Sequence, residues 1–493
     1  MSEVLRDILA TLSQNDFAPP KKETAAGLRA LLSLAQKGVR KKRPQDEQAL
    51  GALKISPALA DYLIALIDEA LSAQVNAILH HPDFMALEAS WRSLLFLTER
   101  LDFTQNIRLE YINVSKADLL KDFQDAPEVV KSGLYRHIYT AEFGQFGGTP
   151  VGAIIADYTF GPGPEDIQLL QYAASVACMA HTPFFAAAGK KFFGLDEWRF
   201  LPDIIDLPAV LDSPRHARWN TFRNNPNARY IGLTLPGFLL RLPYGTKNAI
   251  PASSFNFIEE SHTDDAFCWG NTAFALAARL GDSFAKYRWC VNIIGPDGGG
   301  SVEGLPCGPH EAMLGIQDKI PTRAIISERR EYELAELGFI SLALGKTPYE
   351  AVFYSANSVL KSKSFPKTPE GAAAEISFRL STQFPYMMLM NRLAHYIKIL
   401  QRENMGAWRE RGELAKELNR WISQYVTAMD TPDALTRSRR PLRMAHIDVR
   451  EIDNEAGWYA VTMLARPHFK YMGVNFNLSL EGRLERSGTG PRD

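Results

Sequence analysis

The sequence predicts an α/β fold of the mixed α+β kind, with several domains, a mixed central sheet flanked by helices and an antiparallel hairpin near the C-terminus. Three observations lead to this prediction. Strand and helix patterns alternate between residues 151 and 188, helical stripes precede and follow that region, and three runs of period-two hydrophobicity lie between residues 442 and 480.

The composition is that of an ordinary soluble globular chain. Its 493 residues allow two or three domains, and 46% of them are hydrophobic. Lys and Arg total 55 against 56 Asp and Glu, so no net charge favours nucleic acid or an anionic membrane. The four cysteines form no C-x-x-C pair and no run of about 18 apolar residues occurs, so we expect no metal site and no membrane insertion.

Residues 1–55 form a first segment with short helical patterns. Apolar residues recur there at helical spacing: Leu5, Ile8, Leu9 and Leu12. Residues 56–330 are expected to form one α/β domain, which begins with a helix capped by Ser56 and started by Pro57. A second helix is marked by Phe84, Leu87, Trp91, Leu94 and Leu95.

The centre of that domain has a strand–helix–strand pattern. Strand 151–158, helix 166–181 and strand 183–188 make a βαβ unit, which predicts a partly parallel sheet. Further strands are expected at 107–111, 229–235 and 289–294, with a helix at 265–280.

Residues 331–493 are expected to form a C-terminal domain. Helices are predicted at 331–344, 384–400 and 414–425, before the period-two runs. Those runs place the following residues on one face of three strands: Ala445, Ile447, Val449, Tyr459, Val461, Met463, Val474, Phe476 and Leu478. Turn-forming residues at 453–457 join the first two strands into a hairpin. A sheet edge there would either pack on its own domain or accept a strand from another chain.

The sequence shows no reaction centre whose parts occur together, so an enzyme is not predicted and no cofactor is expected. Gly345, Lys346 and Thr347 lack the first glycine of a phosphate loop, and the His310-Glu311 pair lacks the second histidine of a zinc-protease motif. The loop 161–166 has glycines after a strand, but Asp166 stands where the dinucleotide fingerprint has its third glycine. An α/β enzyme or nucleotide-binding module using that loop remains the alternative.

Several long segments resemble a known family. Residues 77–95, 113–123, 131–160, 336–342 and 392–398 resemble the large subunit of the bacterial type VI secretion contractile sheath (TssC/VipB, EvpB-like family). Residues 440–443, 457–459 and 466–469 fit the same family, and the likeness spans roughly residues 56–480. Residues 1–55 match loosely, and Ala456 stands where the family tends to have proline.

The resemblance implies a cytoplasmic structural protein rather than an enzyme. Such subunits pair with a small TssB/VipA-like subunit and stack helically around an Hcp-like inner tube built on a baseplate. Contraction expels the inner tube, and a ClpV-like AAA+ unfoldase then dismantles the sheath through an N-terminal helix of the large subunit. The resemblance implies that the C-terminal strands join neighbouring protomers and that the helix with Leu5, Ile8, Leu9 and Leu12 is recognised by the unfoldase.

Overall fold

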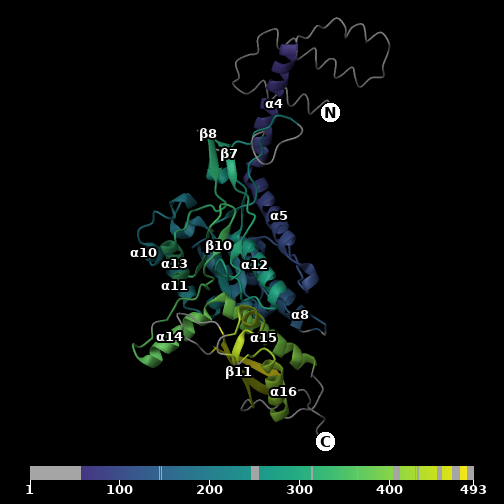
Figure 1. Cartoon of the computed structure of the whole chain (residues 1–493), viewed down its shortest axis with the longest axis vertical. Coiled ribbons are helices and arrows are strands. Elements are labelled where there is room, and N and C mark those ends of the chain that lie inside the picture. The colour runs from purple at the N-terminus through teal and green to yellow at the C-terminus, as the bar shows by residue number, and fades with distance from the viewer. Residues whose placement is uncertain are drawn as a thin grey trace, which may run out of the picture. The chain divides into compact units, whose positions relative to one another are not determined.

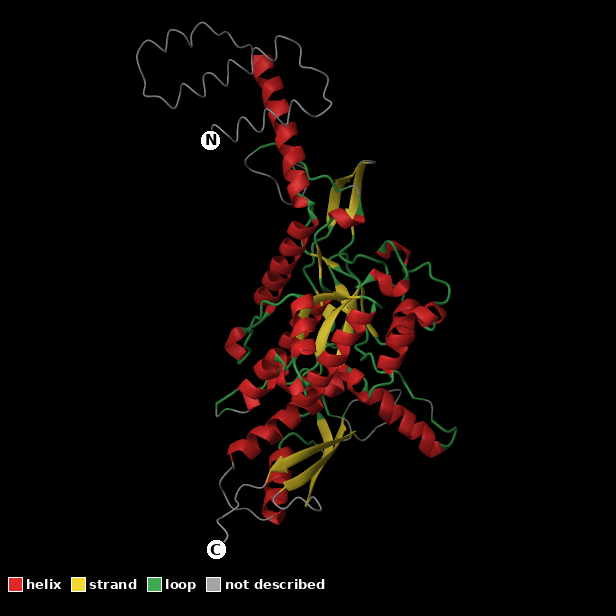
Figure 2. Ribbon diagram, turned by 180° about the vertical axis from the view of Figure 1, so that it is seen from behind, coloured by secondary structure: helices red, strands yellow, loops and turns green. Residues whose placement is uncertain are grey.

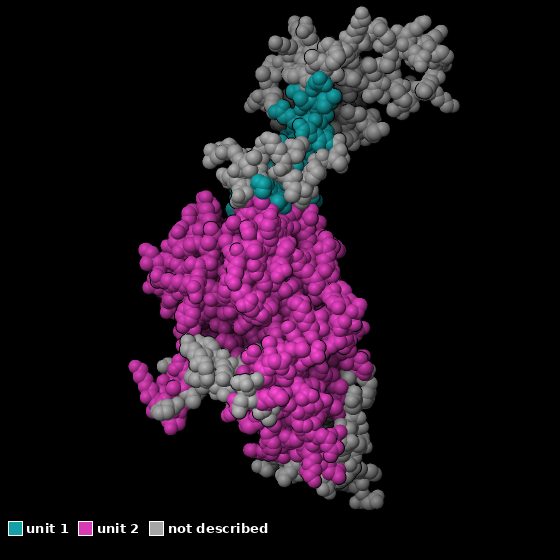
Figure 3. Space-filling view, in the orientation of Figure 1, with its two compact units in different colours: residues 1–86, 242–267, 309–317 teal, residues 87–241, 268–308, 318–493 magenta. Residues whose placement is uncertain are grey.

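The computed structural model describes residues 57–143, 145, 147–245, 255–261, 263–312, 315–363, 365–403, 411–427, 429, 432–451, 458–468 and 478–485. The predictions made for residues 1–56, for the turn at 453–457, and for Val474 and Phe476 therefore lie outside the described residues. The chain divides into two compact units, distinguished by colour in Figure 3. The small unit comprises residues 1–86, 242–267 and 309–317, and the large unit the remainder.

The small unit contains the helix α4 (Pro57–Leu79) and the first residues of α5 (Pro82–Arg100). The carboxylate of the buried Glu259 accepts a hydrogen bond from the Tyr244 backbone N–H at 2.9 Å and lies 3.4 Å from His80 Nε2. A hairpin of β7 (Gly308–Ala312) and β8 (Gly315–Lys319) holds the His310-Glu311 pair in a strand. A zinc-protease motif needs that pair on a helix, so the motif is excluded.

The large unit is built on a six-stranded mixed sheet, seen in Figure 2. The strands are, in spatial order, β1 (Ile154–Phe160), β2 (Phe184–Ala188), β3 (Ile231–Leu235), β9 (Phe339–Leu344), β10 (Ala351–Phe353) and β6 (Ser301–Val302). The first four are parallel, and β10 is antiparallel to both of its neighbours. The predicted mixed central sheet is confirmed. The strands β4 (Phe238–Leu239) and β5 (Trp269–Gly270) form a separate two-stranded antiparallel sheet.

Helices surround this sheet, and α9 (Pro164–Ala180) and α12 (Thr272–Tyr287) pack against its parallel strands. The remaining helices of the central region are short. A second group, from α14 (Pro369–Ser381) to α17 (Ala434–Arg439), comes after the last strand of the sheet in the chain. Their bounds are α6 (Lys116–Asp125), α7 (Gly133–Tyr135), α8 (Ala141–Phe143), α9 (Pro164–Ala180), α10 (Leu207–Leu211), α11 (Ala217–Arg223), α12 (Thr272–Tyr287), α13 (Glu328–Glu336), α14 (Pro369–Ser381), α15 (Phe384–Glu403), α16 (Arg411–Ser423) and α17 (Ala434–Arg439).

The core of the large unit is rich in aromatic side chains, and its strands are buried along their length. Gly232 in β3 shows how tightly it packs, because a Cβ there would lie 2.6 Å from the Phe185 ring and 2.9 Å from that of Phe384. Only glycine fits between those two rings. The methionines at 387, 388 and 390 are buried, as their core-filling interpretation predicts.

Several predicted elements differ from the structure. The helix expected at 265–280 lies later in the chain, as α12 at Thr272–Tyr287, and residues 269–270 belong to β5. Residues 107–111 form no strand; Leu109 and Tyr111 are exposed there. Residues 289–294 also form none, although Trp289, Val291 and Ile293 are buried in strict alternation. The predicted helix 331–344 is wrong in its second half, because α13 ends at Glu336 and the largely apolar run after Gly338 is the central strand β9.

Candidate functional site

The C-terminal sheet consists of β11 (Leu442–Glu451), β12 (Trp458–Pro467) and β13 (Leu478–Glu485), with β12 in the middle. Both pairings are antiparallel. Ile447 lies opposite Met463, and Val461 lies between Val449 on one side and Gly482 on the other. The predicted antiparallel hairpin is confirmed, and Figure 1 shows its strand β11 next to α15 and α16.

One face of this sheet is anchored in a second hydrophobic core. Ile447, Val449, Val461, Met463 and Ala465 are at most 4% exposed and belong to a cluster with residues of α15 and α16. The helices contribute mainly Leu389, Met390, Leu393, Ile397, Leu418 and Ile422. Each fully buried Val, Ile, Leu or Met side chain among them contributes about 1.5–3 kcal/mol of transfer free energy. The hairpin is therefore a fixed part of the large unit.

The structure contains seven of the nine predicted strand residues in these three strands. Ala445 is half-buried, and Ile447, Val449, Val461 and Met463 share its apolar face. Tyr459 lies in β12 opposite Glu451 and Leu484, and Leu478 lies in β13 opposite Ala465. The third strand runs from 478 to 485, later than the run ending at Leu480 predicts.

The two edges of the sheet differ. At the β11 edge, the Asn419 side chain of α16 exchanges two hydrogen bonds with the backbone of Ile447, and Thr427 N–H and Tyr425 C=O do the same with Leu442. At the other edge, β13 has no second strand beside it among the described residues. Sequence patterns missed Asn419, because an asparagine between apolar helix residues gives no signal of a strand contact.

The orientation of the backbone groups in β12 follows from the Ile447 contacts. In an antiparallel ladder, the N–H and C=O of one residue point to the same side, and those of the next residue to the other. The backbone N–H and C=O of Ile447 point away from β12. Those of Met463, the residue opposite, therefore point away from β11. The N–H groups of Met463 and Val461 therefore face β13.

Trp289 connects the central region to the C-terminal sheet. It follows α12, is 4% exposed and packs in the second core, and its indole Nε1 donates to the Arg439 carbonyl at 3.1 Å. Close by, Asn292 Nδ2 donates to Ser438 Oγ at 2.9 Å. These contacts join the segment that follows α12 to α17, just before β11 begins.

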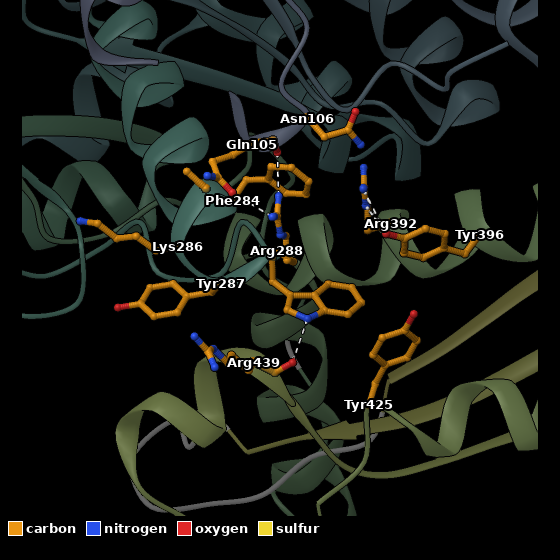
Figure 4. Close-up of a pocket in the computed structure, with 12 residues that line it drawn as sticks. Gln105, Asn106, Phe284, Lys286, Tyr287, Arg288, Arg392, Tyr396, Tyr425 and Arg439 are labelled. Atoms are coloured by element: carbon orange, nitrogen blue, oxygen red, sulfur yellow. Dashed lines mark hydrogen bonds between the residues drawn. The ribbon is translucent and has the colours of Figure 1, made fainter. Parts of the chain in front are cut away.

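A cleft of about 810 Å³ opens beside this connection, and Figure 4 shows the residues around it. Arg288 donates to both the backbone and the side-chain oxygen of Gln105, at 2.7 and 2.8 Å. Arg392 stacks on the rings of Phe284 and Tyr396 and donates to the Tyr396 hydroxyl at 3.1 Å. The arginines are thus held by aromatic and amide groups of the large unit, an arrangement that serves packing.

A buried polar cluster joins α15 to the end of α9. His395 Nε2 donates to the Ala180 carbonyl at 2.9 Å, and Lys398 Nζ to that of Met179 at 3.3 Å. Burial lowers the pKa of His395 to about 4, that of His181 to about 3 and that of Lys398 to about 8. Both imidazoles are neutral near pH 7, so this cluster caps α9 structurally.

The loop 161–166 gives no support to the nucleotide alternative. The Asp166 carboxylate accepts the Gly161 N–H at 2.6 Å and pairs with Lys116 Nζ at 2.6 Å. Glu165 and Asp166 occupy the first turn of α9, so a phosphate would meet two carboxylates. Among the described residues, no group of His, Cys, Asp and Glu side chains is suited to a metal, and no helix is long and apolar enough to span a membrane.

Comparison with known proteins identifies the family. Residues 61–360 match the EvpB/VC_A0108 tail sheath N-terminal domain, and residues 373–484 match the EvpB/VC_A0108 tail sheath gpW/gp25-like domain. The type VI secretion system sheath protein TssC1 of Pseudomonas aeruginosa is 36% identical over 428 residues, which cover 86% of this chain and 85% of that protein.

Two cryo-EM structures of the anti-feeding prophage are also similar. Its sixfold-symmetrised baseplate contains a chain with a TM-score of 0.32 and 8% identity, covering 79% of this chain and 81% of that one. Its helical sheath in the contracted state gives a TM-score of 0.28 and 10% identity, with 68% and 67% covered. Together, the domain matches and the sequence identity show that this chain belongs to the EvpB/VC_A0108 tail sheath family, as a contractile sheath large subunit of the type VI secretion system and a structural protein rather than an enzyme.

Proposed function

We propose that this subunit builds the sheath by sharing strands of its C-terminal sheet with neighbouring copies. The observation that carries the proposal is the position of β13. It is an edge strand, all of its ladder pairs are with β12, and residues 468–477 separate it from β12 in the chain. A β13 contributed by a neighbouring copy would make the same ladder, because it has the same sequence.

The hydrophobic anchoring favours this exchange. The side chains of β11 and β12 that enter the second core belong to the hairpin, so each copy retains a fixed acceptor. Main-chain hydrogen bonds then connect the copies, while the connecting segments bend as the subunit bodies move into tighter contact. A sheath assembled in a higher-energy extended arrangement would contract without nucleotide hydrolysis in this chain.

The proposal includes the partners implied by the family. A small TssB/VipA-like subunit would pair with residues 1–55 and with an exposed stripe on α5. That stripe consists of Leu87, Trp91 and Leu95, spaced by four residues and 55%, 61% and 52% exposed. Exposed apolar stripes of this kind mark protein interfaces. The sheath would enclose an Hcp-like inner tube, stand on a baseplate in the cytoplasm and be recycled by a ClpV-like unfoldase that recognises Leu5, Ile8, Leu9 and Leu12.

The test removes one N–H that faces β13. Val461→Pro deletes this donor, and Val461→Ala is the control that keeps it while also reducing the side chain. With the small subunit co-expressed, Val461→Pro should leave a soluble heterodimer without long tubes in negative-stain electron microscopy, whereas Val461→Ala should form tubes. Tubes of normal length from the proline variant would refute strand sharing.

A further inference from the structure

The side chain of Asn419 acts as a substitute strand on the outer edge of β11. Its Oδ1 accepts the Ile447 N–H at 2.9 Å and its Nδ2 donates to the Ile447 carbonyl at 2.7 Å. A neighbouring strand would make the same two bonds with this residue. The second Nδ2 hydrogen is also used, in a 2.8 Å bond to the Ala415 carbonyl of the same helix. The amide is therefore held in place by α16.

The start of the same edge is closed by backbone. Leu442 N–H donates to the Tyr425 carbonyl at 3.3 Å, and Thr427 N–H donates to the Leu442 carbonyl at 2.9 Å. The pairing of β11 with β12 is irregular between Leu442 and Met444, and such irregularities bend an edge away from partners. Leu442 and Ile447 of β11 thus each have a backbone N–H and C=O that point away from β12 and are already hydrogen-bonded.

We infer that Asn419 is a positioning residue that closes the β11 edge and directs any strand from a second sheath polypeptide to the β13 side of the sheet. This inference rests on the proposed strand sharing and adds its direction. A sheet open at both edges would accept strands on either side, and copies joined in two ways would not continue one regular helix. With one edge closed, each sheet accepts strands from one direction only.

The experiment uses the co-expressed complex and a peptide probe with the sequence of residues 478–485 carrying a photocrosslinker at its N-terminus. Asn419→Ala removes the cap, and Arg420→Ala, an exposed neighbour on α16, is the matched control. Asn419→Asp keeps the size of the side chain but places an acceptor against the Ile447 carbonyl. Crosslinked positions are read by mass spectrometry, and amide hydrogen exchange at Ile447 reports whether the edge has opened.

In the wild type and in Arg420→Ala, we expect the probe on β12 or β13 and not on β11. In Asn419→Ala, the Ile447 amide should exchange about tenfold faster, because the hydrogen bond that it donates to the side chain is lost, and crosslinks to β11 should appear. Asn419→Asp keeps an acceptor for the Ile447 N–H and loses only the bond to the Ile447 carbonyl, so its increase in exchange should be smaller. Crosslinks to β11 in the wild type, or an unchanged β11 edge in the Asn419 variants, would overturn the role of Asn419 while leaving strand sharing intact. A probe that reaches no strand in any protein would instead count against strand sharing itself.

Discussion

His395 in the middle of α15 donates a 2.9 Å hydrogen bond to the carbonyl of Ala180, the last residue of α9. The last carbonyl groups of a helix have no N–H partner within the helix, and the neutral imidazole supplies one here. His181, which follows Ala180 with a φ of 53°, lies in the same cluster, 3.3 Å from the Tyr230 hydroxyl. The helix that leads to the C-terminal sheet is thereby fixed to the central α/β region.

The first prediction is a loss of stability in acid. Burial lowers the pKa of His395 to about 4 and that of His181 to about 3, both below the ordinary value of 6.5. The unfolded chain therefore binds more protons than the folded chain between these values. The free energy of unfolding should fall by at most about 1.4 kcal/mol per pH unit for each histidine as the pH decreases from 6.5, and level off below the lowered values.

Urea unfolding at pH 7 and pH 5 measures this effect, and His395→Gln is the matched variant. Glutamine retains an N–H for the Ala180 carbonyl and does not titrate, so its unfolding midpoint should depend less on pH. An equal pH dependence in both proteins would show that His395 is not the group responsible.

The second prediction concerns Gly338, between α13 and β9. Its φ is +84°, and a Cβ there would lie 2.9 Å from Val359 Cα and 3.0 Å from the Ser358 carbonyl oxygen. Gly338→Ala should therefore lower the free energy of unfolding by about 1–3 kcal/mol. Gly147 has a φ of +83° with no atom within 4 Å of the Cβ position, so Gly147→Ala measures the backbone strain alone. Equal losses in both variants would argue against a clash with the 358–359 backbone.

The third prediction tests the α5 stripe. Trp91→Asp places a charge in the centre of the proposed contact and should reduce co-purification of the small subunit by about 30-fold, equivalent to the loss of one hot-spot residue. Trp91→Phe keeps an apolar ring and should retain most of the pairing. Because Trp91 is 61% exposed, circular dichroism should show both variants folded. Full pairing of the aspartate variant would place the small subunit elsewhere.

The fourth prediction concerns the N-terminal leucine and isoleucine residues. Replacing Leu5, Ile8, Leu9 and Leu12 with serine should leave tube assembly unchanged and abolish disassembly of contracted tubes by the unfoldase. A light-scattering time course with ATP follows both steps. Disassembly at the wild-type rate would exclude this segment as the recognition site.

The fold was predictable where local pattern and tertiary packing agree. The strand–helix–strand unit around α9 follows from short apolar runs on either side of a helical stretch. The terminal hairpin follows from period-two alternation, and the face that this pattern marks is buried in the second core. The error at 331–344 arose where a short apolar run fits either structure. The positive φ at Gly338 separates α13 from β9, and burial on both faces makes the run a central strand.

Residues 289–294 have the pattern of a strand but do not form one. Trp289, Val291 and Ile293 alternate as in a strand, but the segment is held by Ser283, whose Oγ donates to the Trp289 carbonyl and accepts the Asn292 N–H. The alternation reflects which side chains are buried and does not indicate that the segment pairs with another strand. Asn419 was missed for a related reason, since its partner Ile447 is 28 residues away and its role depends on tertiary structure.

Strand sharing is tested most directly by mixing in one sheath two variants that each introduce one cysteine, in a chain whose four native cysteines are replaced by serine. Thr462 lies opposite Glu481 in the β12–β13 pair. The backbone N–H and C=O of Thr462 face β11, so the two residues form a non-hydrogen-bonded pair. Such pairs bring the two Cβ atoms within the distance that a disulfide needs. When Thr462→Cys and Glu481→Cys chains are co-assembled and oxidised, strand sharing predicts covalent dimers on a non-reducing gel. The double variant, left unassembled, should instead close the bond within one chain. Mixed sheaths that yield monomers alone would contradict the account.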